Sequence, residues 1–188
     1  NSNVVTKKKN HYDIKGWKKL LKKCGNYMNK MIPDSYDIIL NELNFLQSNW
    51  PDNLPKGIIH ADLFPDNVLF LNNELSGIID FYFSSYDLFL YDLAILINAW
   101  CFKGKTFCKV NFLNILNGYE SNRKLEVDEK NFLNICLRGA AVRFFMTRMY
   151  DLLFIKKKKN LIHKNPKEYL EKLIFHKSIL NFSDYVEY

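Results

Sequence analysis

The stretch HADLFPDNVLFLNNELSGIIDF occupies residues 60–81 and predicts two polar loops joined by a β-hairpin. The first loop has the spacing H-x-D-x-x-x-x-N between His60 and Asn67, and Asp80 follows the second apolar run. Two short β-type runs between the loops are separated by the turn dipeptide Asn72-Asn73. Because loops on a rigid scaffold often carry chemistry, this stretch is the candidate functional site.

The residue types in these loops suit phosphoryl transfer. The attacking hydroxyl needs a carboxylate that orients it and accepts its proton, and Asp62 is the candidate for this role. A metal ion of the Mg²⁺ type takes hard oxygen ligands, which Asn67 and Asp80 would supply. His60 is expected to be structural and to tie the loop to its surroundings. The two loops therefore predict a kinase site that uses ATP and Mg²⁺.

The remainder of the chain is dominated by helical periodicity. Apolar residues recur at helical spacing and predict helices near residues 17–24, 38–50, 88–100, 110–117, 129–154 and 166–180. Residues 1–11 are polar and basic and predict a linker or a frayed end. The expected fold class is thus α+β and mainly helical, with one domain over residues 12–188.

Composition limits the other classes of function. The chain has 188 residues, 48% of them hydrophobic, and a net charge of +7. Its lysines lack interleaved aromatic residues, so a nucleic-acid partner is not expected, although a basic nucleic-acid binder stays an alternative. The four cysteines form no CxxC pair. Without a signal peptide or an apolar run of about 18 residues, we expect a cytoplasmic protein without a membrane partner.

Three sequence blocks carry a resemblance to a known family. The two loops resemble the catalytic and metal loops of the aminoglycoside-phosphotransferase and choline-kinase-like branch of the protein-kinase fold. The sequence around these loops is similar to that of the homoserine kinases of that branch. The similar segments are residues 54–64, 66–70, 77–83, 91–94, 98, 100–101, 137–141, 143–144 and 148–151.

The resemblance implies a fold, an activity and a domain organisation. It implies phosphorylation of L-homoserine by ATP to O-phospho-L-homoserine, a step toward threonine, with Asp62 as base and Asn67 and Asp80 as magnesium ligands. It also implies that residues 12–188 are the C-terminal catalytic lobe. Members of this family begin with an N-terminal lobe that covers ATP, and the chain starts with Asn rather than Met. We therefore expect a fragment that lacks this lobe, binds ATP weakly and turns over poorly.

Four further residues are candidates for substrate binding. Arg143 and Arg148 could each bind a substrate carboxylate through a planar guanidinium, or could instead be structural. Tyr82 and Trp100 could line a substrate pocket, although aromatic residues at these spacings are more often part of a core. Asp92 begins a predicted helix and is expected to have a structural role.

Two other functions stay open at this stage. The chain could belong to a kinase of another small alcohol, such as choline or an aminoglycoside. It could also be a non-catalytic remnant of a kinase lobe that acts as a binding protein, an alternative motivated by the missing lobe. The presence of all three predicted base and metal positions argues against the remnant.

Overall fold

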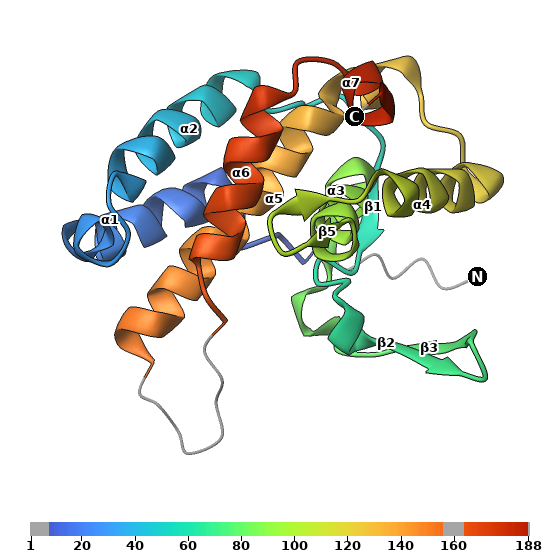
Figure 1. Ribbon diagram of the computed structural model, residues 1–188, viewed down its shortest axis with the longest axis horizontal. Helices are drawn as coiled ribbons and strands as arrows, with labels where there is room; N and C mark the ends of the chain where they lie inside the picture. Colours follow the sequence, from blue (N-terminus) through green and yellow to red (C-terminus); the bar gives the residue numbers. More distant parts are fainter. Residues whose placement is uncertain (1–7, 156–163, 188) are drawn as a thin grey trace.

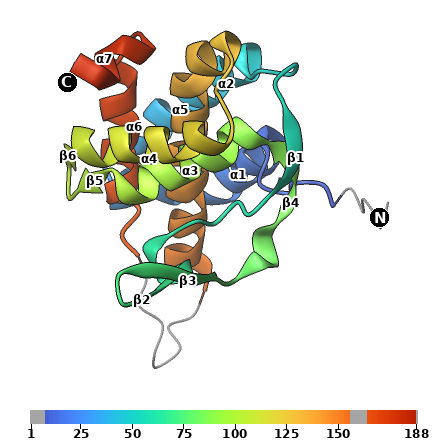
Figure 2. The ribbon, with the colours of Figure 1, turned by 90° about the vertical axis from the view of Figure 1, so that its right-hand side faces the viewer.

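The longest helix, α5 (Val127–Phe154), lies at the centre of the protein. The computed structural model describes residues 8–155 and 164–187. Helices α1, α2, α3, α6 and α7 all pack against α5, with α1 and α2 on one side of it and α3 and α4 on the other (Figures 1 and 2). A capping box formed by Glu126 and Glu129 starts α5, because each side chain accepts a backbone N–H of the other residue.

The fold is mainly helical α+β with small sheets, as the sequence predicted. The other helices are α1 (Ile14–Met31), α2 (Ser35–Asn49), α3 (Phe89–Trp100), α4 (Lys109–Asn122), α6 (Lys167–Ser178) and α7 (Phe182–Glu187). In α1 the buried residues recur at helical spacing and form the face toward α2 and α5. They are Trp17, Leu21, Cys24 and Met28.

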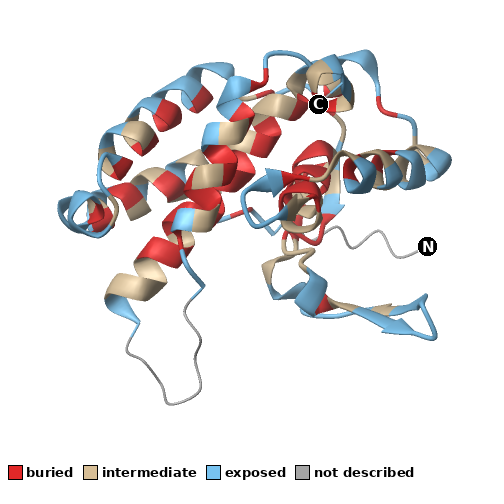
Figure 3. Cartoon of the chain, viewed as in Figure 1, coloured by how far each residue is buried: buried red, intermediate tan, exposed pale blue. Residues whose placement is uncertain are grey.

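Three two-stranded antiparallel sheets complete the described structure. Strand β1 (Lys56–Ile59) pairs with β4 (Ser85–Leu88), β2 (Val68–Leu71) with β3 (Glu74–Ile78), and β5 (Phe102–Lys103) with β6 (Thr106–Phe107). Asn72 and Asn73 both have positive φ angles, as a two-residue hairpin turn requires. The β2–β3 hairpin projects from the helical body, and its residues are mostly exposed (Figure 3).

Two segments differ from the sequence-based expectation. The last helix was predicted to continue to about residue 180, but α6 ends at Ser178 and a separate helix, α7, follows. The Asp184 carboxylate accepts the N–H groups of Leu180 and Asn181, which fixes the turn between the two helices. Residues 8–11 belong to the segment predicted as a linker, and the N–H of Tyr86 in β4 donates to the carbonyl of Lys8. Residues 1–7 of that segment lie outside the described residues.

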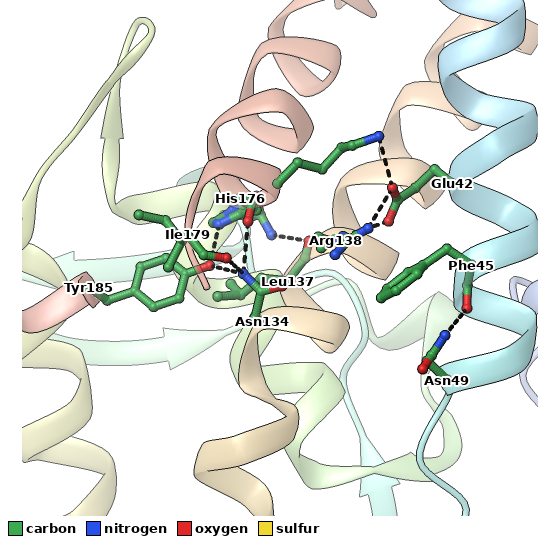
Figure 4. A network of polar contacts seen from close by, with 11 residues as sticks. Glu42, Phe45, Asn49, Asn134, Leu137, Arg138, His176, Ile179 and Tyr185 are labelled. Carbon is green, nitrogen blue, oxygen red and sulfur yellow. Dashed lines mark hydrogen bonds and ion pairs between the residues drawn. The ribbon is translucent and has the colours of Figure 1, made fainter. Parts of the chain in front are cut away.

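Buried polar contacts align α2, α5 and α6 (Figure 4). The Arg138 guanidinium donates to both carboxylate oxygens of Glu42, at 2.6 and 2.8 Å. Asn134 on α5 donates to the carbonyls of His176 and Ile179, at the end of α6. Burial lowers the pKa of His176 to about 3, so this ring is neutral at physiological pH.

Gly139 is a buried glycine that permits close packing against two tryptophans, and its replacement is the first prediction. A Cβ at Gly139 would lie 2.3 Å from Cζ3 of Trp50 and 3.1 Å from Cη2 of Trp17. Gly139→Ala is therefore expected to lower the free energy of unfolding by about 1–3 kcal/mol, measured by urea denaturation. Gly118→Ala is the matched control, since that Cβ meets no atom within 4 Å. Alanine should there raise stability by about 0.5–1 kcal/mol, and equal effects of the two changes would contradict the packing explanation.

The described residues include no membrane-spanning candidate. None of their helices is long and apolar enough to cross a membrane.

Candidate active site

Asp92, in the first turn of α3, holds the start of the predicted catalytic loop. Its carboxylate accepts the N–H of His60 at 3.0 Å and the N–H of Ala61 at 2.7 Å. Ala61 has a φ of 65°, a left-handed conformation that is unfavourable for a residue with a Cβ. The two hydrogen bonds offset this cost and fix the loop. Burial raises the pKa of Asp92, and the two backbone donors oppose this rise.

His60 connects the two loops through both ring nitrogens. Its Nδ1 lies 3.2 Å from the N–H of Asp62, and its Nε2 lies 2.9 Å from the carbonyl oxygen of Ile79. Because Nδ1 accepts a hydrogen bond from the Asp62 N–H, the neutral ring carries its hydrogen on Nε2, which donates a hydrogen bond to the carbonyl of Ile79. The Phe81 ring lies 4.6 Å from the imidazole, measured between centroids. Through these contacts His60 ties the first loop to the residue that follows β3.

Asn67 lies directly beside Asp62. Its Nδ2 donates to the backbone carbonyl of Asp62 at 2.8 Å and to the Asp62 carboxylate oxygen Oδ2 at 3.1 Å. The carbonyl of Asn67 accepts the N–H of Ile79 at 3.0 Å, which joins this loop to the end of β3. Since the amide nitrogen faces Asp62, the amide oxygen Oδ1 points away from it and is free to bind a cation.

Asp80 follows β3 and precedes the short 3₁₀ helix η2 (Phe81–Phe83). It has a φ of 63°, which is tolerated better by Asp than by most other residues. Its charge is close enough to raise the pKa of Asp62, but burial of Asp62 is the largest cause of that rise. Arg143, Asn67 and His60 oppose the rise because they favour the ionised carboxylate.

These loops border a cavity of about 710 Å³. Asp62, Asn67 and Asp80 line the cavity, and so do Arg143 and Arg148 from α5. The structure thus brings together the predicted base, both predicted metal ligands and two of the four predicted substrate residues.

Arg148 and the two predicted aromatic residues are placed differently from Arg143. The Arg148 guanidinium donates to Glu168 at 2.6 Å and is engaged in that ion pair. Tyr82 is 79% exposed and does not line the cavity. Trp100 also does not line the cavity. Its Nε1–H donates to the carbonyl of Leu63 and so supports the loop that contains Asp62. The geometry therefore favours structural contacts for Arg148 and Trp100. Tyr82 is not among the residues that line the cavity.

Several lining residues were not found from the sequence. Phe83 stands three positions after Asp80, so its closeness to the metal loop was a signal that could have been used. Phe144 lies beside Arg143 in a block that the resemblance already included. Tyr12 and Lys164 come from distant parts of the chain, and no local pattern indicates that they meet the loops.

The oxygen donors at the cavity fit a hard divalent cation. Asp80 forms no hydrogen bond or ion pair within residues 8–155 and 164–187, so its carboxylate is free to bind a cation. Among those residues, no three His, Cys, Asp or Glu side chains gather to hold a metal ion. A site here would thus depend on the Asn67 amide oxygen together with carboxylates.

The mainly helical α+β architecture is consistent with a kinase-like fold, and the cavity groups a carboxylate with hard oxygen donors. This combination is consistent with the phosphotransferase class of protein. Comparison of sequences agrees, since residues 8–124 match the phosphotransferase enzyme family. The chain belongs to this family.

Homoserine kinases of several bacteria are similar to the chain. The homoserine kinase of Rhizobium meliloti is 42% identical over 180 residues, which cover 95% of this chain and 55% of that protein. Those of Rhizobium johnstonii and Agrobacterium fabrum are 44% and 43% identical over 95% of this chain and 56% of each protein. The chain thus spans about half the length of the curated relatives it matches.

Proposed function

We propose that the protein containing this chain transfers the γ-phosphoryl group of ATP to the hydroxyl of L-homoserine. The observation that carries the proposal is the 42–44% identity to homoserine kinases over 95% of the chain. The grouping of Asp62, Asn67 and Asp80 at one cavity supports it independently.

The proposed roles follow from what each side chain can do. Asp62 orients the acceptor hydroxyl and accepts its proton, and its carboxylate is steadied by the Asn67 amide at 3.1 Å. Asn67 and Asp80 hold Mg²⁺ through oxygen atoms. When bound, Mg²⁺ neutralises charge on the triphosphate. His60 and Asp92 touch no reacting atom and position the loop.

We also propose that the chain corresponds to the C-terminal catalytic lobe of a kinase-like fold. The family match and the predicted base and metal ligands in this chain support this assignment. A separate N-terminal lobe would then cover ATP, and the chain by itself would bind ATP weakly.

The decisive experiment measures phosphorylation of several alcohols by the full-length protein. L-homoserine, choline and an aminoglycoside are each supplied with ATP and Mg²⁺, and ADP release is followed. L-homoserine is expected to be the preferred acceptor. Preference for choline or an aminoglycoside would leave the phosphotransferase class intact and reject the substrate. No turnover of any alcohol would favour the binding-protein alternative.

Asp80→Ala is expected to weaken the binding of magnesium and of the nucleotide together. The Mg²⁺ concentration that gives half-maximal turnover should therefore rise. The change removes a predicted metal ligand, and loss of groups that support a metal typically costs about 10–100-fold in metal affinity. The measurement is the Mg²⁺ concentration that gives half-maximal turnover, determined at several ATP concentrations. Glu74→Ala, an exposed acidic residue at the start of β3, is the control. An unchanged Mg²⁺ requirement would remove Asp80 from the metal site.

A further inference from the structure

Arg143 is an unusual arginine because it is buried without an acceptor for two of its nitrogens. Arg143 is 2% exposed and lines the cavity, yet its Nε and Nη1 form no hydrogen bond within residues 8–155 and 164–187. Burial raises the pKa of Tyr91, and the Arg143 guanidinium beside its hydroxyl opposes this rise both as a charge and as a weak hydrogen-bond donor, although the pair lacks ideal hydrogen-bond geometry. The other arginines each pair with a glutamate: Arg123 with Glu129, Arg138 with Glu42 and Arg148 with Glu168.

An unpaired buried guanidinium costs free energy, so a structure that retains one needs compensation. Aromatic rings provide part of it. The guanidinium carbon lies 4.7 Å from the ring centroid of Phe144, 5.1 Å from that of Tyr12 and 5.7 Å from that of Phe83. These rings stabilise the positive charge, but they do not accept the in-plane N–H groups. Because Nε and Nη1 are shielded from solvent, a ligand in the cavity would first meet the guanidinium through Nη2, which forms no hydrogen bond to the described residues.

The surrounding contacts also fix where the guanidinium lies. Tyr12 precedes α1 and its N–H donates to Asn10, which in turn donates to Asp87 of β4. Phe83 closes the short helix that begins directly after Asp80, and its ring lies 5.6 Å from that of Tyr12. Arg143 is thus held between α5, the predicted metal loop and the segment before α1.

Arg143 and the predicted base, Asp62, line the same cavity. The positive charge of Arg143 is the largest influence that lowers the pKa of Asp62 against the effect of burial. An acceptor whose hydroxyl meets Asp62 would extend from that point into the cavity beside the guanidinium. A carboxylate is the group that a guanidinium binds best through paired N–H···O bonds.

We propose that Arg143 is a specificity-determining residue that selects acceptor alcohols carrying a carboxylate. Tyr12, Phe83 and Phe144 hold its guanidinium in place. The proposal rests on the proposed function, since it takes Asp62 as the point where the acceptor hydroxyl binds. A cationic acceptor such as choline would meet a buried positive charge at the same position, which disfavours it.

The test compares acceptors that differ by one group. L-homoserine carries both a carboxylate and an ammonium, 3-amino-1-propanol lacks the carboxylate, and 4-hydroxybutyrate lacks the ammonium. In the full-length protein, Arg143→Gln is expected to lower kcat/KM for L-homoserine by about 100-fold or more. The value for 3-amino-1-propanol should change little, because the missing contact is the carboxylate. Arg143→Lys keeps the charge without the planar fork and should fall between.

Arg138→Lys is the matched control, on the same helix and outside the cavity lining. It tests loss of a guanidinium as such, and it should leave the preference for L-homoserine over 3-amino-1-propanol unchanged. Equal losses for both acceptors in Arg143→Gln would overturn the proposal, because Arg143 would then act through Asp62. A raised KM for ATP with unchanged acceptor preference would also overturn it and assign Arg143 to phosphate.

Calorimetry on the full-length protein separates this proposal from the proposed function. Binding of 4-hydroxybutyrate should be detectable in the wild type, weakened in Arg143→Lys and lost in Arg143→Gln. If the wild type does not phosphorylate L-homoserine but shows this Arg143-dependent binding, the function is wrong and the carboxylate site stands. If the wild type binds 4-hydroxybutyrate no more tightly than the variants do, the carboxylate site is rejected whatever the turnover.

Discussion

Asp62→Asn is expected to lower kcat by about 100- to 10,000-fold while ATP affinity stays near normal. Asparagine has the same shape and can still accept the Asn67 amide hydrogen bond, so the loop should keep its conformation. It cannot take the proton of the attacking hydroxyl, which is the role proposed for this carboxylate. Steady-state kinetics with L-homoserine, together with nucleotide binding by calorimetry, measures both parts of the expectation.

Asp66→Asn is the matched control for this change. Asp66 belongs to the same loop, but its carboxylate pairs with Lys164 at 2.8 Å and both side chains are largely exposed. An exposed ion pair contributes little free energy, so turnover should remain close to that of the wild type. Equal and modest effects at residues 62 and 66 would contradict the assignment of the base.

Asp92→Ala is expected to reduce both stability and turnover strongly. The change removes the acceptor of two backbone N–H groups, one of them on Ala61 with its left-handed conformation. Two unsatisfied donors cost about 2–6 kcal/mol if they stay buried, which the loop can avoid only by moving. Movement of about 1 Å at the loop would lower kcat by roughly 100-fold. Urea denaturation and steady-state kinetics are the measurements.

Asp184→Ala provides the comparison for this second change. The Asp184 carboxylate likewise accepts two backbone N–H groups, but it does so in the turn before α7. Its removal should lower stability and leave kcat unchanged in the folded protein. If Asp92→Ala lowered stability with kcat intact, Asp92 would have no positioning role in the loop.

The helices could be predicted from the sequence because their signals are local. Apolar residues at helical spacing located α3 and α5 to within two residues at each end. The turn between α6 and α7 was missed because it depends on the Asp184 carboxylate and not on a Gly or Pro signal. The pairing of β1 with β4 was missed as well, since strand partners far apart in sequence leave no local pattern.

The residues of the candidate site also fall into two groups, those that local sequence indicated and those that only helix packing brings to the site. Asp62, Asn67 and Asp80 stand within one short stretch, so their spacing alone predicted a shared site. Asp92 and Arg143 reach that site from α3 and α5, and only the packing of these helices brings them there.

The sequence by itself therefore determined the two polar loops, the mainly helical fold class and the phosphotransferase type of chemistry. These three features depend on residue type and on spacing over short stretches of sequence. The tertiary structure distinguished the two predicted arginines at the cavity, because Arg148 pairs with Glu168 whereas Arg143 forms no ion pair within the described part of the chain. Whether each arginine has an ion-pair partner depends on side chains from other helices. The sequence next to each arginine therefore does not reveal it.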